Sequence, residues 1–259
     1  MIPRIAWLFG CCFLAACATD PGDDSASRIV LESDGGPPPS GFAVDYSIWQ
    51  LQLPSGGTSP DVIPPSKLAT YSDAYFMKAD DGGQIFMDPL TGVPTGGSTH
   101  PRTELREVDA NGDGALWSPS GTNTLTVTGK AIECASCTIG QIFNGSASIT
   151  LAELEYSSDS GGSLKLLYEE AKGTAGTPLD LGVEVPLNQV YTFVLSLSNN
   201  RLSVSVDGHS VYSYTPSAPT LADQFYFKAG NYDQEAGAGP VTTSPHSQIE
   251  NYAIAVTHE

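Results

Sequence analysis

Short alternating runs separated by turn residues constrain the fold of this 259-residue chain more than any other feature. The clearest run is Leu-Ser-Val-Ser-Val at 202–206, and Asp207-Gly208 separates it from the next run, His209–Tyr214. Alternation with period two is typical of a β-strand with one buried face, and Asp-Gly is typical of a two-residue hairpin turn. Similar runs occur at 124–128, 146–155, 163–168, 191–197, 224–228 and 248–256.

Helical periodicity is not sustained over several turns anywhere in the chain, although residues 66–69 could form one short helical turn. The 27 glycines and 19 prolines are consistent with frequent turns. Many short strands of this kind predict an all-β fold, a bent two-sheet antiparallel sandwich or β-jelly roll. We see neither an internal repeat nor an interior boundary, so residues 42–259 are expected to form one domain.

The N-terminus has the features of an export signal. Arg4 precedes an apolar run over residues 5–16, which is too short to span a bilayer. Leu-Ala-Ala-Cys at 14–17 resembles a bacterial lipobox, so we expect cleavage before Cys17 and lipidation of its thiol; an ordinary signal peptide is the alternative. Residues 1–17 would be the signal peptide and residues 18–41 a flexible linker. The protein would be exported and lipid-anchored to the bacterial outer membrane or cell surface, or else secreted, with the anchor as its one membrane contact.

Two further cysteines, Cys134 and Cys137, form a Cys-Ala-Ser-Cys motif. Such a motif can be a local disulfide, a redox dithiol or half of a zinc site. Export favours the disulfide, because oxidising compartments preserve such bonds. The motif also has neither a second cysteine pair for zinc nor a surrounding βαβ pattern.

The formal net charge of −18, with 11 Lys and Arg residues, argues against a nucleic-acid partner, because phosphate binding needs clustered cations. Three of these cations nevertheless lie in two short segments, 101–107 and 226–234. In an extended strand Arg102, Glu104 and Arg106 project from one face. Two guanidinium groups beside a carboxylate can hold a carboxylate ligand bidentately. We therefore predict a local anion site on an acidic protein.

Two other acidic patterns have alternative interpretations. Glu153 and Glu155 could be the paired carboxylates of a glycoside hydrolase, but alternating glutamates more often form one solvated or groove-lining strand face. The segment 109–114 begins like a calcium loop but has no bidentate glutamate after it, so a polar turn is favoured. We predict no metal and no cofactor.

Three segments resemble the signature segments of alginate lyases of polysaccharide lyase family 7. They are Arg-Thr-Glu-Leu-Arg at 102–106, Gln-Ile-Phe at 141–143 and Tyr-Phe-Lys-Ala-Gly-Asn-Tyr-Asp-Gln at 226–234. The run at 46–54 also resembles that family's first strand, so the similarity covers about residues 42–257. The resemblance implies a β-jelly roll of two bent antiparallel sheets with a substrate groove on the concave face.

The resemblance also implies β-elimination on a 1,4-linked polyuronate, which leaves a 4,5-unsaturated uronate end. The reaction requires neutralisation of the uronate carboxylate, removal of the C5 proton and protonation of O4. Carried over by motif position, Arg102 and Gln141 would neutralise the carboxylate, and Tyr232 would donate the proton and could also be the base. The residues that would position the sugars are Glu104, Arg106, Lys228, Gln234 and Tyr226, with Asn231 a weaker candidate. The partner would be an anionic polysaccharide, alginate or another polyuronate, bound by a monomer.

Phe143 departs from the family pattern, which usually has a histidine there as general base. Phenylalanine cannot accept a proton and would instead form an apolar wall of the groove. In β-D-mannuronate and β-D-glucuronate, H5 and the C4–O bond lie on the same face of the ring, so one tyrosinate could serve both. Nearby cations would lower the pKa of Tyr232 and favour that form. We therefore expect syn-elimination on mannuronate-rich alginate or β-glucuronan.

Two alternatives follow from the same departure. His100, two residues before Arg102, could face the groove and replace the base, although an exposed loop histidine is the simpler interpretation. The other histidines, His209, His246 and His258, are expected at the surface. The chain could instead be a catalytically silent surface carbohydrate-binding protein with a lyase-like fold.

Overall fold

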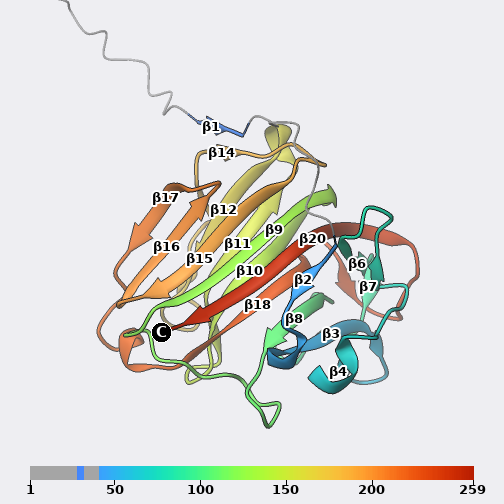
Figure 1. Cartoon of the computed structure of the whole chain (residues 1–259), viewed down its shortest axis with the longest axis horizontal. Coiled ribbons are helices and arrows are strands. Elements are labelled where there is room, and N and C mark those ends of the chain that lie inside the picture. Colours follow the sequence, from blue (N-terminus) through green and yellow to red (C-terminus); the bar gives the residue numbers. More distant parts are fainter. Residues whose placement is uncertain (1–27, 32–40) are drawn as a thin grey trace, which may run out of the picture.

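The computed structural model describes residues 28–31 and 41–259, and Figure 1 shows them as two packed sheets. The predicted signal peptide, Cys17 and most of the expected linker lie outside the described residues. No helix in the described ranges is long and apolar enough to cross a membrane. The prediction of an all-β sandwich of two large antiparallel sheets is confirmed.

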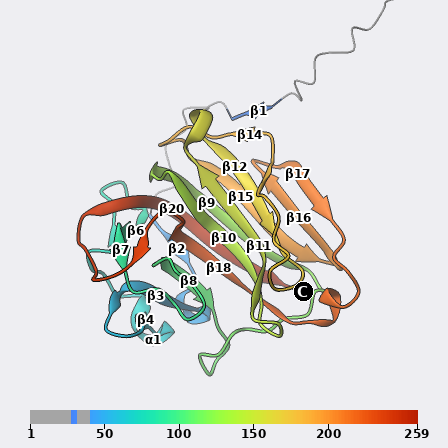
Figure 2. The ribbon, with the colours of Figure 1, turned by 180° about the vertical axis from the view of Figure 1, so that it is seen from behind.

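The first sheet carries the segments singled out in the sequence. Its spatial order is β13 (Leu179–Asp180), β12 (Ser163–Tyr168), β11 (Ile149–Ser157), β10 (Ser136–Asn144), β18 (Phe225–Asp233), β8 (Thr103–Glu107), β3 (Trp49–Gly56) and β4 (Pro60–Ile63). The three motif strands β8, β18 and β10 are therefore adjacent in the middle of the sheet, although they lie far apart in the sequence (Figure 2).

The second sheet packs against the back of the first. Its order is β17 (His209–Tyr214), β16 (Arg201–Val206), β15 (Tyr191–Ser198), β9 (Asn123–Glu133), β20 (Pro245–His258), β6 (Gln84–Pro89) and β5 (Phe76–Lys78), with β2 (Ala43–Val44) paired to β20. Two short parallel pairs complete the strands, β1 (Ile29–Val30) with β14 (Val183–Glu184) and β7 (Thr91–Gly92) with β19 (Gly237–Ala238). The α-helix α1 (Pro65–Leu68) and the 3₁₀ turns η1 (Tyr46–Ile48), η2 (Asp159–Gly161) and η3 (Thr220–Ala222) lie in connections.

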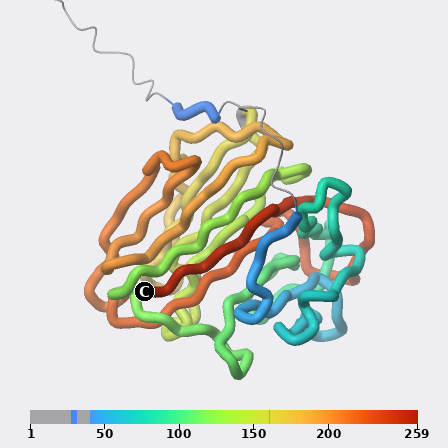
Figure 3. The backbone as a smooth tube through the Cα atoms, in the orientation of Figure 1, coloured from blue at the N-terminus to red at the C-terminus, as the bar shows by residue number. Residues whose placement is uncertain are grey.

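Alternation along the strands places apolar side chains between the sheets. In β9 buried and half-buried positions alternate over almost the whole strand, and the inward side chains include Leu125 and Val127. Strand β18 is buried on both faces: Phe225 and Phe227 join the core, whereas Tyr226 and Lys228 point to the opposite side. Figure 3 shows the long, gently curved course of the central strands.

The predicted hairpin turn at Asp207-Gly208 is confirmed by backbone angles, and a second turn has the same geometry. Asp207 and Gly208 have φ of 47° and 80° and join β16 to β17, and Asn199 and Asn200 have φ of 50° and 62° between β15 and β16. Paired positive φ values match the right-handed twist of the flanking strands. The strand predicted from residue 146 was wrong at its start, because the Asn144 side chain accepts a hydrogen bond from the Ala147 amide and closes a turn there.

The expectation of an unstructured linker was wrong for residues 28–31. Ile29 and Val30 pair with β14, and Leu31 is buried at its end. Arg28 contacts Asp180 at 3.2 Å and Glu184 at 3.0 Å. This stretch is therefore an additional strand at the edge of the domain.

Two smaller motifs are resolved by local geometry. Cys134, in the connection from β9 to β10, forms a disulfide with Cys137 at the start of β10, and both side chains are buried. The Asp109 carboxylate accepts hydrogen bonds from the amides of Asn111 and Asp113, at 2.8 and 3.0 Å. The 109–114 segment is therefore a polar turn.

Gly230, in the middle of β18, allows β18 and β8 to approach each other closely. Its φ is 143°, and an added Cβ would lie 2.7 Å from the Thr103 carbonyl oxygen and 2.8 Å from the Phe86 ring. We predict that Gly230→Ala destabilises the domain by about 2 kcal/mol or more. The control Gly57→Ala places its methyl in open space, so its melting temperature should be unchanged. Equal melting temperatures for both variants would show that the close approach of β18 and β8 does not require a glycine at position 230.

Candidate active site

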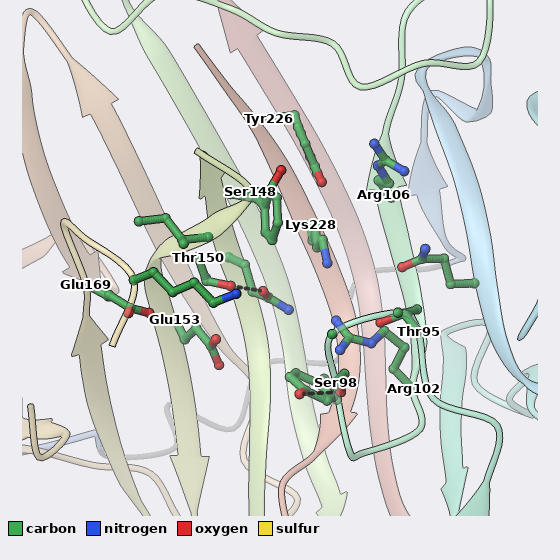
Figure 4. Close-up of a pocket in the computed structure, with 18 residues that line it drawn as sticks. Thr95, Ser98, Arg102, Arg106, Ser148, Thr150, Glu153, Glu169, Tyr226 and Lys228 are labelled. Atoms are coloured by element: carbon green, nitrogen blue, oxygen red, sulfur yellow. Dashed lines mark hydrogen bonds between the residues drawn. The ribbon is translucent and has the colours of Figure 1, made fainter. Parts of the chain in front are cut away.

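A cavity of about 500 Å³ opens on the outer face of the first sheet, and Figure 4 shows the residues that line it. Its floor comes from β8, β18, β10 and β11, and the loops 95–98 and 169–172 border it. Seven of the residues selected from the sequence line the cavity: Arg102, Arg106, Gln141, Phe143, Tyr226, Lys228 and Tyr232.

Strand register explains why these side chains meet. Gln141 of β10 lies opposite Lys228 of β18, and Lys228 lies opposite Arg106 of β8. One step along, Phe143 lies opposite Tyr226. Directly opposed residues on one face of a sheet have side chains in contact range, so the register builds the floor of the cavity.

Glu104 lies beneath this surface and connects its polar groups. Its carboxylate contacts Arg102 Nη1 at 3.1 Å and Lys228 Nζ at 3.5 Å, and it accepts a hydrogen bond from Gln141 Nε2. The side chain is 1% exposed and does not line the cavity. Glu104 was expected both to position sugars and to orient neighbouring site residues; its contacts with the three donors above it match the second role, and it does not line the cavity.

Tyr232 lies between Arg102 and the 95–98 loop. The Arg102 guanidinium carbon is 3.7 Å from the centroid of the tyrosine ring, and the Ser98 hydroxyl is 2.9 Å from the phenol oxygen. Burial raises the pKa of the phenol, and the charge of Arg102 and the Ser98 hydrogen bond only partly oppose it. The expectation that nearby cations lower this pKa was wrong in its net direction, because desolvation dominates.

Lys228 lies deeper in the same row. Burial lowers the pKa of its ammonium to about 8, and the opposing effect of Glu104 is smaller. Its Nζ is 4.9 Å from the centroid of the Phe143 ring. The Lys228 ammonium therefore lies beside an apolar ring in the cavity floor.

Phe143 and Tyr226 form an aromatic wall. Their rings stack with centroids 5.0 Å apart and an interplanar angle of 28°, and the Arg106 guanidinium lies 4.7 Å from the Tyr226 ring centroid. Burial raises the pKa of Tyr226 to about 12, so its phenol is protonated at neutral pH.

Besides Glu104, three selected residues do not line the cavity. His100 is half-buried rather than exposed: its Nδ1 lies 2.5 Å from the Ala236 carbonyl oxygen, behind Tyr232. Gln234 donates hydrogen bonds to the Thr138 hydroxyl and to the Tyr232 carbonyl oxygen, so it supports strands rather than sugars. Asn231 is fully buried on the core side, where it donates to the Ser247 hydroxyl.

The surface prediction for the remaining histidines holds for His209, which is exposed. It also holds for His258, which is exposed although its Nε2 lies 2.6 Å from the buried Glu107 carboxylate. His246 is instead half-buried, and its Nδ1 lies 2.6 Å from the buried Asp233 carboxylate. Sequence pattern carries no signal for such pairs, because the partners come from other strands.

The residues of the two bordering loops were not predicted as site residues, and Gly96-Gly97 was the one available signal in the sequence. Of the two alternating glutamates, Glu153 lines the cavity and Glu155 does not. Burial and the charge of Glu153 raise the pKa of Glu155 to about 7. Of the two carboxylates, only that of Glu153 faces the cavity.

The family assignment follows from the whole domain. A family model described as alginate lyase matches residues 44–258, which include every strand of both large sheets apart from the first residue of β2. The chain belongs to the alginate lyase family.

Solved structures of this family share the fold. An alginate lyase from Pseudomonas aeruginosa is 28% identical with a TM-score of 0.74, covering 83% of this chain and 100% of its own. The alginate lyase A1-II', a member of polysaccharide lyase family 7, is 25% identical with a TM-score of 0.72, covering 83% and 96%. AlgAT5, from the same family, is 27% identical with a TM-score of 0.68, covering 83% and 96%. No curated protein matches the chain. Family and fold together support a polysaccharide lyase activity on alginate.

The effect of the Ser98 hydrogen bond on the pKa of Tyr232 can be tested by substitution. Because the Ser98 hydrogen bond lowers the pKa of Tyr232, Ser98→Ala should raise that pKa further, and Ser98→Thr should restore it. The measurement is the ultraviolet titration of tyrosinate, with the Tyr232→Phe titration subtracted. An unchanged curve in Ser98→Ala would show that the contact does not stabilise the phenolate.

Proposed function

We propose that this chain cleaves 1,4-linked polyuronates by β-elimination, with Tyr232 taking the C5 proton and returning it to O4. The preferred polymer would be mannuronate-rich alginate or β-glucuronan. The observation that carries the proposal is the pairing of Tyr232 with Arg102 in a cavity that Phe143 also lines.

The first requirement is neutralisation of the uronate carboxylate. Arg102 and Gln141 are both tied to Glu104, so their free donors are already oriented into the cavity before substrate binds. Arg102 is 4% exposed, and its Nε has no hydrogen-bond partner in the described structure. A carboxylate ligand would compensate this desolvated guanidinium and stabilise the enolate-like intermediate.

The second requirement is a group that can both accept and donate a proton. Tyr232 is the acidic hydroxyl nearest Arg102, and its phenolate form would remove H5. Because burial raises its pKa, the fraction of phenolate grows as pH rises towards that pKa, and the rate should rise with it. Above pH 8 Lys228 loses its proton, which would weaken binding of the polyanion.

Stereochemistry connects Phe143 to the substrate. In mannuronate and glucuronate, H5 and O4 lie on one face, so Tyr232 can serve both steps. In α-L-guluronate they lie on opposite faces, and a second group is required where Phe143 stands. The loss of imidazole should therefore reduce guluronate cleavage more strongly.

The similar structures support the cavity as the polymer site. A variant of A1-II' with tyrosine changed to phenylalanine is in complex with the product GGG. A variant with a further histidine-to-asparagine change is in complex with the substrate GGMG. Export with a lipid on Cys17 and a monomeric state stay predictions from the sequence.

Phe143 also favours a second candidate, a silent carbohydrate-binding protein. Tyr232→Phe distinguishes the two. We predict that this variant loses at least about 100-fold in turnover, the scale of a general acid–base contribution, while polymannuronate binding by calorimetry stays within a few-fold. Wild-type protein that binds but forms no unsaturated ends would establish the binding protein instead.

Polymer preference tests the syn-elimination. We predict that the wild type forms unsaturated ends faster from polymannuronate or glucuronan than from polyguluronate, as measured by ultraviolet absorbance. Phe143→His should increase polyguluronate cleavage by restoring a base on the opposite face. Phe143→Leu is the control, since it opens the same space without a base. Wild-type preference for polyguluronate would contradict the mechanism.

A further inference from the structure

Thr150 is a cavity residue to which neither the family motifs nor the elimination assigns a part. It lies near the start of β11 and lines the cavity together with Gln141 and Phe143 (Figure 4). Gln141 is one of the two groups that would neutralise the uronate carboxylate, so a residue in contact with it can affect the reaction.

A β-bulge in β11 turns Thr150 towards the cavity. The register between β10 and β11 shifts between Ile142 and Phe143. Phe143 therefore lies opposite Thr150, and Leu151 is an extra residue in β11 that is fully buried in the core. Thr150 and Glu153 are three positions apart and would face opposite sides of a regular strand, yet both line the cavity. Bulges of this kind re-aim side chains next to active sites.

The Thr150 hydroxyl and the Glu104 carboxylate hold the two ends of the Gln141 amide. The hydroxyl donates to Gln141 Oε1 at 3.4 Å, because a carbonyl oxygen can only accept. At the other end, Gln141 Nε2 donates to Glu104. No other donor in the described ranges bonds to Oε1, and Gln141 is 1% exposed, so water cannot readily replace the hydroxyl.

These two contacts decide which atoms of the amide face a bound uronate. One N–H of Gln141 goes to Glu104, which leaves the second N–H for the uronate carboxylate. An amide held by Glu104 alone could rotate about that bond and bring its carbonyl oxygen towards the carboxylate, where two acceptors would repel each other. The bond from Thr150 keeps this oxygen on the β11 side.

We propose that Thr150 is a positioning residue of the elimination, whose hydroxyl fixes the Gln141 amide with an N–H directed at the uronate carboxylate. The inference rests on the proposed elimination, in which the electron pair of the C5–H bond spreads onto that carboxylate when Tyr232 removes the proton. A donor that is already oriented stabilises this charge without rearranging during the reaction. Loosening the amide should therefore slow turnover more than it weakens binding.

Thr150→Val tests the hydroxyl, because valine keeps the β-branched shape and has a methyl group in its place. We expect kcat on polymannuronate to fall about tenfold, less than the roughly 100-fold or more that loss of a whole donor costs, with KM within about twofold. Thr150→Ser should retain most of the wild-type kcat, because it keeps the donor. The measurement is the ultraviolet absorbance of unsaturated ends, and melting temperatures check that each variant is folded.

Gln141→Ala separates positioning from a general structural role. In that background the amide is absent, so Thr150→Val should cause no further loss of kcat. Thr126→Val is the matched control, since Thr126 is half-buried on β9 of the other sheet, and it should keep the wild-type kcat.

A wild-type kcat in Thr150→Val, or an equal loss in Thr150→Ser, would overturn the role of the hydroxyl while leaving the elimination intact. A further loss in the Gln141→Ala background would show that Thr150 does not act through the amide and would also overturn the inference. Wild-type protein that forms no unsaturated ends from any polyuronate would overturn the proposed elimination itself, and the role of Thr150 with it.

Discussion

The buried carboxylate of Glu104 is the interaction on which the cavity depends. It contacts Lys228 of β18, Gln141 of β10 and Arg102, which directly precedes β8. Two cations under a protein surface are unfavourable unless an anion compensates them, and removing one member of a buried pair typically costs ~3–5 kcal/mol. Glu104 therefore holds the positive charge that a uronate needs and also fixes its geometry.

Burial of this cluster explains the titration behaviour around it. The same desolvation lowers the pKa of Lys228 to about 8 and raises the pKa of Tyr232. Both shifts favour the neutral form, and Lys228 loses its proton within about one pH unit above neutrality. A negatively charged substrate entering the cavity changes that balance, since it favours the protonated lysine.

Charge is also distributed asymmetrically across the sheet. The β8 side of the cavity has Arg102 and Arg106, and the β11 side has Glu153. On a chain with a formal charge of −18, a polyanion approaches against the overall field, so binding must come from this local arrangement. Shape and hydrogen bonding then decide which sugars the groove accepts on each side.

The sequence by itself determined the sandwich, the hairpin turns and most of the cavity floor, because alternation with period two sets the face of each side chain. Arg102, Glu104 and Arg106 needed only that rule, and the motif resemblance added Gln141, Lys228 and Tyr232. The sequence could not show that Glu104 lies beneath its neighbours or that His100 turns behind Tyr232. It also could not show that Ile29 and Val30 pair with β14. Those outcomes depend on contacts between strands distant in the chain. Only the tertiary structure decided the direction of the Tyr232 pKa, because desolvation depends on what covers a group rather than on its neighbours in sequence.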